Sequence, residues 1–275
     1  METNVIHNTN CVDGLRTLPD GAIDLTVTSP PYDNLRKYNG TSVWGEAVFR
    51  QLAPALFRVT KPGGVVVWIV GDATVNGSET GSSFRQALGF MECGFRLHDT
   101  MIYQKNGFAY PETNRYYPAF EYMFIFSRGK PKTASLITDR PNRYAGNRVS
   151  GTERKPNGAL VPRSAAKNGL ERHVKAQGVR LNVWAYSVGN GRTTKDRFAH
   201  AHPAMFPERL AEDHILTWSA PGDIVLDPFM GSGTTAKMAL RNGRRFLGHE
   251  INAEYCALAR RRVEAAKEVE PVGTG

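Results

Sequence analysis

The stretch IVLDPFMGSGTTA, residues 224–236, joins a short apolar run to a glycine-rich turn and the start of a helical pattern. Glycines at 231 and 233 let the backbone approach a ligand closely where a strand passes into a helix N-terminus. Glu250 lies 19 positions after Gly231, at the end of the next apolar run, where it can accept hydrogen bonds from ribose hydroxyls. The stretch predicts a nucleoside site in an α/β fold. It fits a dinucleotide as well as S-adenosyl-L-methionine.

A second stretch, TSPPY at residues 28–32, directly follows the apolar run at 23–27. Two consecutive prolines fix φ and remove two backbone donors, so the chain leaves the predicted strand along one stiff path. This corner would present the Ser29 hydroxyl and the Pro30 carbonyl as acceptors, with the Tyr32 ring close by. Two acceptors and a ring suit a planar ligand that carries an exocyclic NH2. On its own, the corner is equally compatible with an ordinary loop after a strand.

The positive charge of the chain is concentrated in one segment. Of the net +9, residues 128–200 contribute +12, from 16 Lys and Arg against 4 Asp and Glu, and the remainder contributes −3. Such a block is typical of a nucleic-acid-binding surface, because released counterions favour contacts with phosphates. A solvated basic loop would have the same composition. The segment therefore predicts a nucleic-acid footprint and leaves that alternative open.

The cysteines and the hydropathy pattern exclude several classes of protein. Cys11, Cys93 and Cys256 are far apart in the 275 residues, which argues against a disulfide framework and against a zinc site, so we expect no metal. No apolar run approaches the roughly 20 residues that span a bilayer, and the N-terminus lacks the form of a signal peptide. We therefore expect a soluble, cytoplasmic protein with no membrane partner.

Apolar runs alternate with helical patterns along most of the chain, which predicts an α/β fold with a mostly parallel sheet. The expected strands lie near residues 4–10, 23–28, 65–70, 95–104, 120–127, 224–227 and 245–251, and the expected helices near 11–18, 44–59, 82–93, 206–219, 234–240 and 253–269. From about residue 128 to 178 no period is sustained. We therefore expect a catalytic domain in two parts, 1–127 and 201–275, separated by a loop-rich, basic target-recognition region at 128–200.

Taken together, the two stretches resemble the amino-methylating DNA methyltransferases, which modify N6 of adenine or N4 of cytosine, in the circular order called β. The resemblance also rests on Lys61-Pro62-Gly63-Gly64, on residues 202–207 and on Gly248-His249-Glu250. It implies a Rossmann-like methyltransferase with seven strands and helices on both faces of the sheet. It further implies S-adenosyl-L-methionine as methyl donor, double-stranded DNA as substrate, and a role in DNA methylation of the restriction-modification type. A homodimer is possible.

The resemblance assigns roles to individual residues. Asn10-Cys11 stands where many members have an Asp-Cys pair that reaches the adenine of the donor, and an asparagine can still hydrogen-bond an adenine edge. Ser29, Pro30, Pro31 and Tyr32 would form the catalytic base pocket. The residues expected to bind the donor are Asn10, Cys11, Ser29, His202, Pro203, Phe206, Asp227, Pro228, Phe229, Gly231, Ser232, Gly233, Thr234 and Glu250.

The implied chemistry fits these residue types. An exocyclic amino nitrogen has its lone pair delocalised into the ring, and acceptors at Ser29 and Pro30 would draw it toward tetrahedral geometry and stabilise developing positive charge. The target base must leave the helical stack, and Tyr32 would stack on it. A C5-cytosine enzyme would need a cysteine after a proline, and none of the three cysteines has that setting.

DNA contacts are expected from two places, the loop after the Pro-Pro corner and the basic segment. Arginine and asparagine can address guanine and adenine edges, although phosphate contacts outnumber base contacts. The candidates are Arg36, Lys37, Tyr38, Arg140, Arg143, Arg148, Arg154, Arg163 and Arg180. Other hypotheses are an RNA or protein-amide N-methyltransferase and a non-catalytic DNA-binding relative. A dehydrogenase ranks last, because its glycine loop predicts no Ser-Pro-Pro-Tyr corner.

Overall fold

The computed structural model describes residues 1–31, 44–107, 114–164, 166–167, 170–189 and 191–267. The chain divides into two compact units, one made of Met1–Ser135 with Asn182–Gly275 and the other of Leu136–Leu181. The sequence predicts a basic target-recognition region at residues 128–200. Its role in reading DNA stays a prediction.

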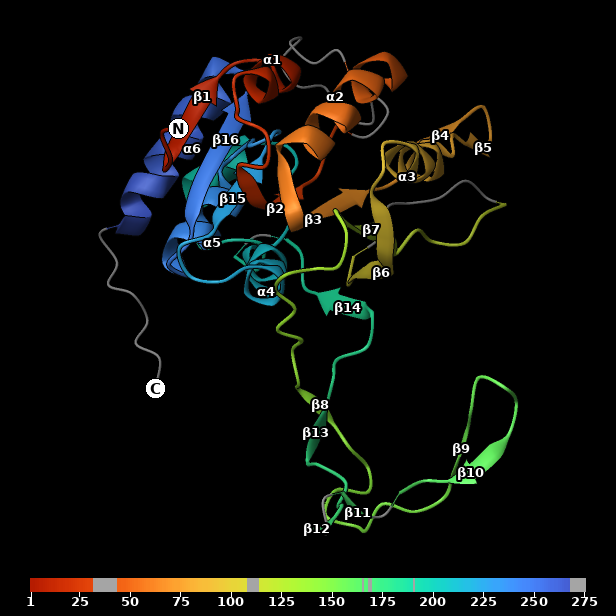
Figure 1. Ribbon diagram of the computed structural model, residues 1–275. Coiled ribbons are helices and arrows are strands. Elements are labelled where there is room, and N and C mark those ends of the chain that lie inside the picture. The colour runs from red at the N-terminus through yellow and green to blue at the C-terminus, as the bar shows by residue number, and fades with distance from the viewer. Residues whose placement is uncertain (32–43, 108–113, 165, 168–169, 190, 268–275) are drawn as a thin grey trace. The chain divides into compact units, whose positions relative to one another are not determined.

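The first unit is built on one mixed sheet with the strand order β1-β16-β15-β2-β3-β7-β6-β14 (Figure 1). Every neighbouring pair is parallel except the two that involve β7. The strands are β1 (Val5–Asn8), β2 (Ile23–Thr28), β3 (Thr60–Val70), β6 (Arg96–Lys105), β7 (Phe120–Ser127), β14 (Val183–Tyr186), β15 (Ile224–Asp227) and β16 (Arg245–Glu250). The expected α/β class with a mostly parallel sheet is confirmed.

Two details of the sheet differ from the sequence-based expectation. The described part of the sheet has eight strands, not seven, because β14 pairs in parallel with the edge strand β6. The four residues of β14 are too few to show a period. In addition, residues 61–64, which precede the strand expected at 65–70, lie inside β3, where Gly63 has φ +80° and the pairing with β2 shifts register between Ile23 and Leu25. Pro62 and the two glycines make an irregularity within the strand rather than ending it.

Helices cover both faces of this sheet, as expected. In one group, α2 (Glu46–Val59) contacts both α1 (Cys11–Arg16) and α3 (Ser82–Glu92); in the other, α5 (Thr234–Arg241) contacts both α4 (Glu208–Trp218) and α6 (Ala253–Lys267). Along β3, Val66, Trp68 and Val70 join a core cluster with residues of α1, α2 and α3, and the intervening residues are also buried. Side chains of a strand alternate between faces. Both faces of β3 are therefore packed, as in other sheets of this class.

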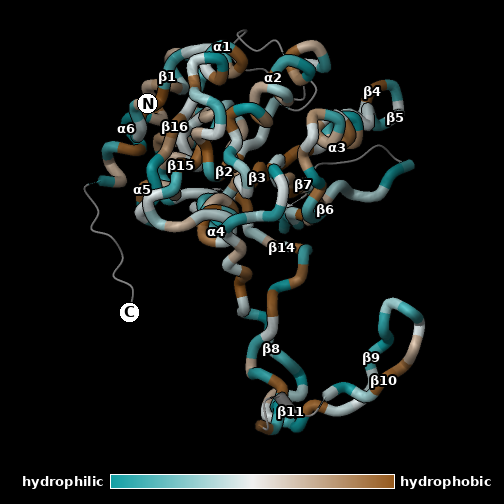
Figure 2. Tube along the Cα trace, viewed as in Figure 1, coloured by the Kyte–Doolittle hydropathy of each residue, from teal (hydrophilic) through white to brown (hydrophobic). Residues whose placement is uncertain are grey.

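Shorter elements complete the first unit. They are the hairpin of β4 (Thr74–Val75) and β5 (Ser78–Glu79) and the 3-10 helix η1 (Arg197–Ala201). Figure 2 shows hydrophobic residues along the central strands β15, β2 and β3, where the burial is deepest.

The second unit consists of three small antiparallel ladders. They are β8 (Arg140–Pro141) with β13 (Gln177–Gly178), β9 (Thr152–Arg154) with β10 (Leu160–Pro162), and β11 (Ala166–Lys167) with β12 (Leu170–Glu171). None of the described side chains of this unit is buried, and Figure 2 shows hydrophilic stretches along β8 and β9. Backbone pairing and ion pairs hold this segment, and it has no hydrophobic core of its own among those side chains.

The packing of α2 on the sheet gives a test of the core. Leu56 is completely buried, whereas Leu88 on α3 is 59% exposed. We expect Leu56→Ala to lower the free energy of unfolding by about 2–5 kcal/mol, because it removes buried methyl groups and leaves a cavity. Leu88→Ala should change it by less than about 0.5 kcal/mol. Urea denaturation of both variants measures this difference, and equal losses would contradict the packing described here.

Candidate active site

The site begins where the direction of the chain through the sheet changes. The strands β15 and β2 are neighbours, but the chain leaves β15 toward β16 and leaves β2 toward β3, on the opposite side. In open α/β sheets, ligands bind at the carboxyl ends of the two strands that flank such a switch point. The stretch after β2 is the Pro-Pro corner, and the stretch after β15 is the glycine loop. The topology therefore brings together the two stretches that the sequence singles out.

A side-chain hydrogen bond joins the ends of these two strands. Thr28 Oγ1 donates to Asp227 Oδ1 at 2.6 Å, inside the protein. The same oxygen accepts from the Phe229 N–H at 3.0 Å, and Thr235 Oγ1 donates to the Val27 carbonyl at 3.1 Å. The glycine loop and the first turn of α5 are thus fixed against the end of β2.

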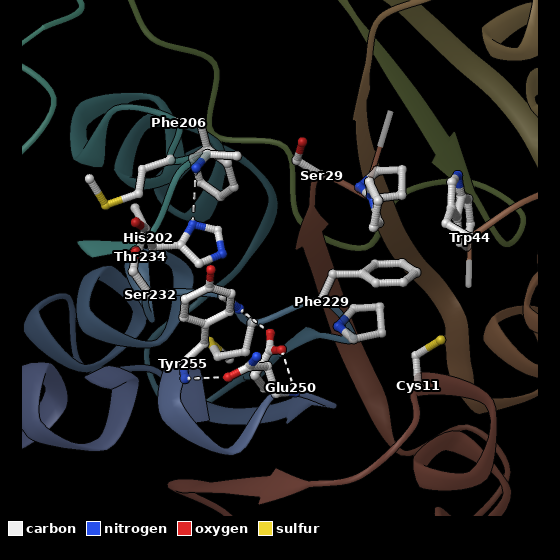
Figure 3. Close-up of a pocket in the computed structure, with 18 of the residues that line it drawn as sticks. Cys11, Ser29, Trp44, His202, Phe206, Phe229, Ser232, Thr234, Glu250 and Tyr255 are labelled. Atoms are coloured by element: carbon white, nitrogen blue, oxygen red, sulfur yellow. Dashed lines mark hydrogen bonds between the residues drawn. The ribbon is translucent and has the colours of Figure 1, made fainter. Parts of the chain in front are cut away.

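One cleft runs along this edge of the sheet, with a cavity volume of about 340 Å³, a size typical of small-molecule sites. Ser29 lies across it from His202 and Phe206, and Phe229, Glu250 and Tyr255 line its floor (Figure 3). The sequence-predicted residues that line it are Asn10, Cys11, Ser29, Pro30, Pro31, His202, Phe206, Pro228, Phe229, Gly231, Ser232, Thr234 and Glu250. Residues from both ends of the chain therefore share one cavity.

Glu250 is held by the glycine loop. Its Oε2 accepts from the Gly231 N–H at 2.8 Å and its Oε1 accepts from the Asn252 N–H at 2.9 Å. Burial raises the pKa of Glu250, and these backbone hydrogen bonds oppose the rise. Each carboxylate oxygen keeps acceptor capacity beyond its one N–H partner. The carboxylate is thus fixed in place and can still accept hydrogen bonds from ligand hydroxyls.

Gly231 must be a glycine for two reasons. Its φ of +51° lies in the left-handed region, and a Cβ at this position would come within 2.9 Å of His202 Nε2. The His202 ring in turn packs edge-on against Tyr255, with ring centroids 4.5 Å apart, and its Nδ1 accepts from the Ala204 N–H. The loop backbone therefore approaches the segment around His202 more closely than any side chain would allow.

Comparisons with known proteins agree with this geometry. A model of the N6/N4 type of DNA methylase matches residues 23–261. The chain belongs to this DNA methylase family. It is 57% identical over 247 residues to the orphan methyltransferase M.BamHII of Bacillus amyloliquefaciens, an alignment that covers 89% of this chain and 90% of that one.

Two solved structures share the fold of this methyltransferase. The PvuII DNA methyltransferase, described as cytosine-N4-specific, aligns over 100% of this chain and 89% of its own, with a TM-score of 0.68 and 20% identity. A DNA modification methylase from Thermus thermophilus, solved in complex with S-adenosyl-L-methionine, aligns over 96% of this chain and 95% of its own, with a TM-score of 0.60 and 23% identity. The expected Rossmann-like methyltransferase fold and DNA amino-methyltransferase family are confirmed.

Three residues expected to bind the donor, Pro203, Asp227 and Gly233, are not among those that line the cleft. Asp227 is 2% exposed and lies beneath the loop, bonded to Thr28 and Phe229. Gly233 has φ +85°, and a Cβ there would lie 3.0 Å from the Ala259 Cβ. Asp227 therefore shapes the loop, and Gly233 allows α5 to pack closely on α6. Direct donor contacts by these three residues stay predictions.

Asn10 and Cys11 line the cleft at the start of α1. Asn10 Oδ1 accepts from the Val12 N–H at 2.8 Å and so caps the helix, which is a common use of this side chain. Burial raises the pKa of the Cys11 thiol to about 12, so the thiol carries its proton at neutral pH. The asparagine oxygen accepts the cap hydrogen bond, and the NH2 group of the same side chain can donate to a ligand.

Several lining residues were missed by the sequence analysis. Trp44, which was assigned to a helix face, packs edge-on against Phe229 with ring centroids 5.1 Å apart. Lys105 at the end of β6 pairs with Glu121 near the start of β7, at 2.9 Å between Nζ and Oε1. Tyr255 also lines the cleft. Of these residues, only Tyr255 could have been found from the sequence, because it lies five positions after Glu250. Trp44, Lys105 and Glu121 belong to no recognisable motif.

The expected DNA contacts fall into two groups. Tyr32, Arg36, Lys37 and Tyr38 lie outside the described residues. In the second unit, Arg180 Nε donates to Asp139 Oδ2 at 3.0 Å and Arg148 pairs with Glu171 at 3.3 Å. The guanidinium groups of Arg140 and Arg154 donate to backbone carbonyls, that of Arg143 lies 5.5 Å from the Tyr144 ring centroid, and the side chain of Arg163 is exposed. Their roles on DNA stay predictions.

Two further observations concern the described part of the chain. It contains no cluster of His, Cys, Asp and Glu side chains that could hold a metal ion. Its helices are all too short or too polar to cross a bilayer.

The buried carboxyl group of Asp227 predicts a pH effect on stability. Burial raises the pKa of Asp227 from 3.8 to about 6, although hydrogen bonds from Thr28 and the Phe229 N–H oppose the rise. Because the folded state binds this proton more tightly than the unfolded state, the carboxyl group favours the fold at low pH and loses that effect as the pH rises through about 6.

We therefore expect Asp227→Asn to remove this pH dependence. The free energy of unfolding of the variant, relative to wild type, should increase by about 2 kcal/mol between about pH 4 and pH 7. Urea denaturation of both proteins across that interval measures the difference. A difference that stays constant with pH would show that Asp227 titrates normally.

Proposed function

We propose that this chain transfers a methyl group from S-adenosyl-L-methionine to N4 of a cytosine flipped out of duplex DNA, at a specific sequence and in the cytoplasm. The observation that carries this proposal is the single cleft lined by Ser29 and Pro30 on one side and by Gly231, Ser232 and Glu250 on the other. A methyl acceptor and its donor must meet within one cavity, because direct transfer needs the reacting atoms in contact.

The donor side of the cleft fits a nucleoside with an amino-acid tail. Glu250, fixed by the Gly231 and Asn252 N–H groups, is placed to accept from ribose hydroxyls. Phe229 and Trp44 offer ring surfaces, and His202 and Phe206 line the wall opposite Ser29. When bound, S-adenosyl-L-methionine supplies a methyl group on a positively charged sulfur. The chain itself supplies position, hydrogen bonds and exclusion of water.

The acceptor side provides what an aromatic amino group needs. The Ser29 hydroxyl and the Pro30 carbonyl would accept hydrogen bonds from the two N–H groups, which localises the nitrogen lone pair for attack. The same acceptors would stabilise positive charge as it develops on that nitrogen. The rigid Pro30-Pro31 corner keeps these oxygens in place without reorganisation during the reaction.

The choice of cytosine rests on residue 29. In the family that the chain resembles, serine at the first motif position is commoner among N4-cytosine members and aspartate among N6-adenine members, and the two groups overlap. Ser29 lies at the end of the buried strand β2 and lines the cleft. A neutral hydroxyl in this place favours the cytosine assignment.

Sequence recognition is assigned to the second unit and to the loop after the corner. None of the described side chains of the second unit is buried, and the unit carries most of the arginines of the basic segment. Arg143 and Arg163 are the strongest candidates for base or phosphate contacts. In contrast, Arg180 and Arg148 are paired with carboxylates, and Arg140 and Arg154 donate to backbone carbonyls. A protein-bound arginine is less available to bind DNA.

The identity of the product tests this assignment. Purified protein is incubated with S-adenosyl-L-methionine and plasmid DNA, and the digested nucleosides are analysed by mass spectrometry. We expect N4-methylcytosine. N6-methyladenine would overturn the choice of base while keeping the reaction class. Methylation of RNA or protein extract, with none of duplex DNA, would overturn the substrate.

The acceptor role of Ser29 predicts a specific kinetic defect. We expect Ser29→Ala to lower kcat by about 100-fold, the order found when one preorganised transition-state hydrogen bond is lost. Calorimetry should show an unchanged Kd for S-adenosyl-L-methionine. Ser78→Ala, in the hairpin of β4 and β5, is the matched control and should leave both values unchanged. A Ser29→Ala enzyme with normal kcat would place the acceptor elsewhere.

A further inference from the structure

We propose that Arg262 is a positioning residue for methyl-donor binding, because its guanidinium holds the glycine loop against the neighbouring segment of the cleft wall. Arg262 lies on α6, does not line the cleft, and is 1% exposed. The inference rests on the proposed function in so far as the glycine loop binds the donor.

One edge of the guanidinium holds the loop. Arg262 Nη1 donates to Thr234 Oγ1 at 2.9 Å, to Ser232 Oγ at 3.1 Å and to the Ser232 carbonyl at 3.3 Å. Ser232 and Thr234 both line the cleft, and both are at least 95% buried. The conformation of the two lining residues that flank Gly233 is thus set from behind by one side chain.

The other nitrogens hold the neighbouring segment of the cleft wall, residues 197–207. Arg262 Nε donates to Asp196 Oδ2 at 2.7 Å, and Nη2 donates to Glu208 Oε1. Asp196 directly precedes η1, and Glu208 begins α4. Between these two anchors lie His202 and Phe206, which line the cleft opposite Ser29. One planar cation therefore fixes both ends of the segment that packs against the loop.

The cluster is completed by Lys237 and Thr194. Lys237 Nζ lies 2.6 Å from Asp196 Oδ2 and 2.8 Å from Glu208 Oε1, and Thr194 Oγ1 donates to Glu208 at 2.7 Å. Burial alone would raise the pKa of Asp196 and of Glu208, but hydrogen bonds and the charges of Lys237 and Arg262 hold both below their ordinary values. Both carboxylates are therefore ionised at neutral pH, and two cations face two anions.

We call the hydrogen bonds of Arg262 to Ser232, Thr234, Asp196 and Glu208 the Arg262 clamp. The shape of the guanidinium makes this clamp specific to arginine. Its donors point in fixed directions in one plane, so it can hold two carboxylates and a loop at once, whereas a lysine ammonium is a point charge on a flexible stem. Replacement by lysine would keep a positive charge beside Asp196 and Glu208. It would lose most of the hydrogen bonds to Ser232 and Thr234.

Arg260 provides a matched control on the same helix. Its Nε and Nη2 donate to the Ile6 carbonyl of β1 at 3.1 and 2.7 Å. It therefore fastens α6 to the sheet without touching the loop. A lysine substitution at 260 tests the general effect of losing an arginine anchor from α6.

The experiment compares Arg262→Lys and Arg260→Lys in the full chain. Calorimetry with S-adenosyl-L-methionine gives the donor Kd, steady-state assays on duplex DNA give kcat and the KM for each substrate, and thermal unfolding gives Tm. For Arg262→Lys we expect the donor Kd and KM to rise about tenfold, as expected when the support of a binding group is loosened, with the KM for DNA unchanged. Arg260→Lys should lower Tm with the donor Kd unchanged.

A second variant covers the case in which Arg262→Lys does not fold. Asp196→Asn keeps the size of the side chain and removes one anionic partner of Arg262, and it should also raise the donor Kd selectively. A donor Kd that stays within twofold of wild type in Arg262→Lys, or rises equally in Arg260→Lys, would overturn the clamp. Wild-type protein that binds no donor would instead overturn the proposed function.

Discussion

The hydrogen bond from Thr28 Oγ1 to Asp227 Oδ1 is the contact on which the site depends. It joins residues 199 positions apart, inside the protein. Thr28 is the last residue of β2 and is followed by the Pro-Pro corner, and Asp227 is the last residue of β15 and is followed by the glycine loop. Because one bond joins the ends of both strands, it ties the position of the Pro-Pro corner to that of the glycine loop.

A second carboxylate reinforces the same strand pair at its other end. The ladder between β15 and β2 is short, pairing Val225 with Leu25 and Leu226 with Thr26. Asp24 Oδ2 accepts from the Ile224 N–H at 3.0 Å, and both Asp24 oxygens accept from Lys61 Nζ. Buried polar groups that are fully paired specify one arrangement, because any other register would leave them without partners. The pair is thus pinned at both ends by side chains.

The sequence predicts the parts of this molecule that are local. Residues 224–236 predict their strand, turn and helix, and the Pro-Pro corner predicts a stiff exit from β2. Nothing local marks β14, whose four residues join the edge of the sheet only by pairing with β6. The Lys105–Glu121 pair and the clamp of Arg262 depend on residues brought together by tertiary packing. Asp227 was expected to bind the ligand, but its observed hydrogen-bond partners are Thr28 and the Phe229 N–H. The spacing of residues in a motif does not show whether a side chain contacts the ligand or supports the loop that does.

The order of the two motifs along the chain is a consequence of this geometry rather than its cause. What the reaction requires is that β2 and β15 be neighbours, with their carboxyl ends at one edge of the sheet. That requirement is met whichever of the two strands comes first in the sequence. The chain passes from β2 to β3 on one side of the pair and from β15 to β16 on the other side. The Pro-Pro corner precedes the glycine loop by about two hundred residues here, and the chain between them contains the second unit. A unit of this kind can therefore be inserted without disturbing the hydrogen bond that holds the two strand ends together.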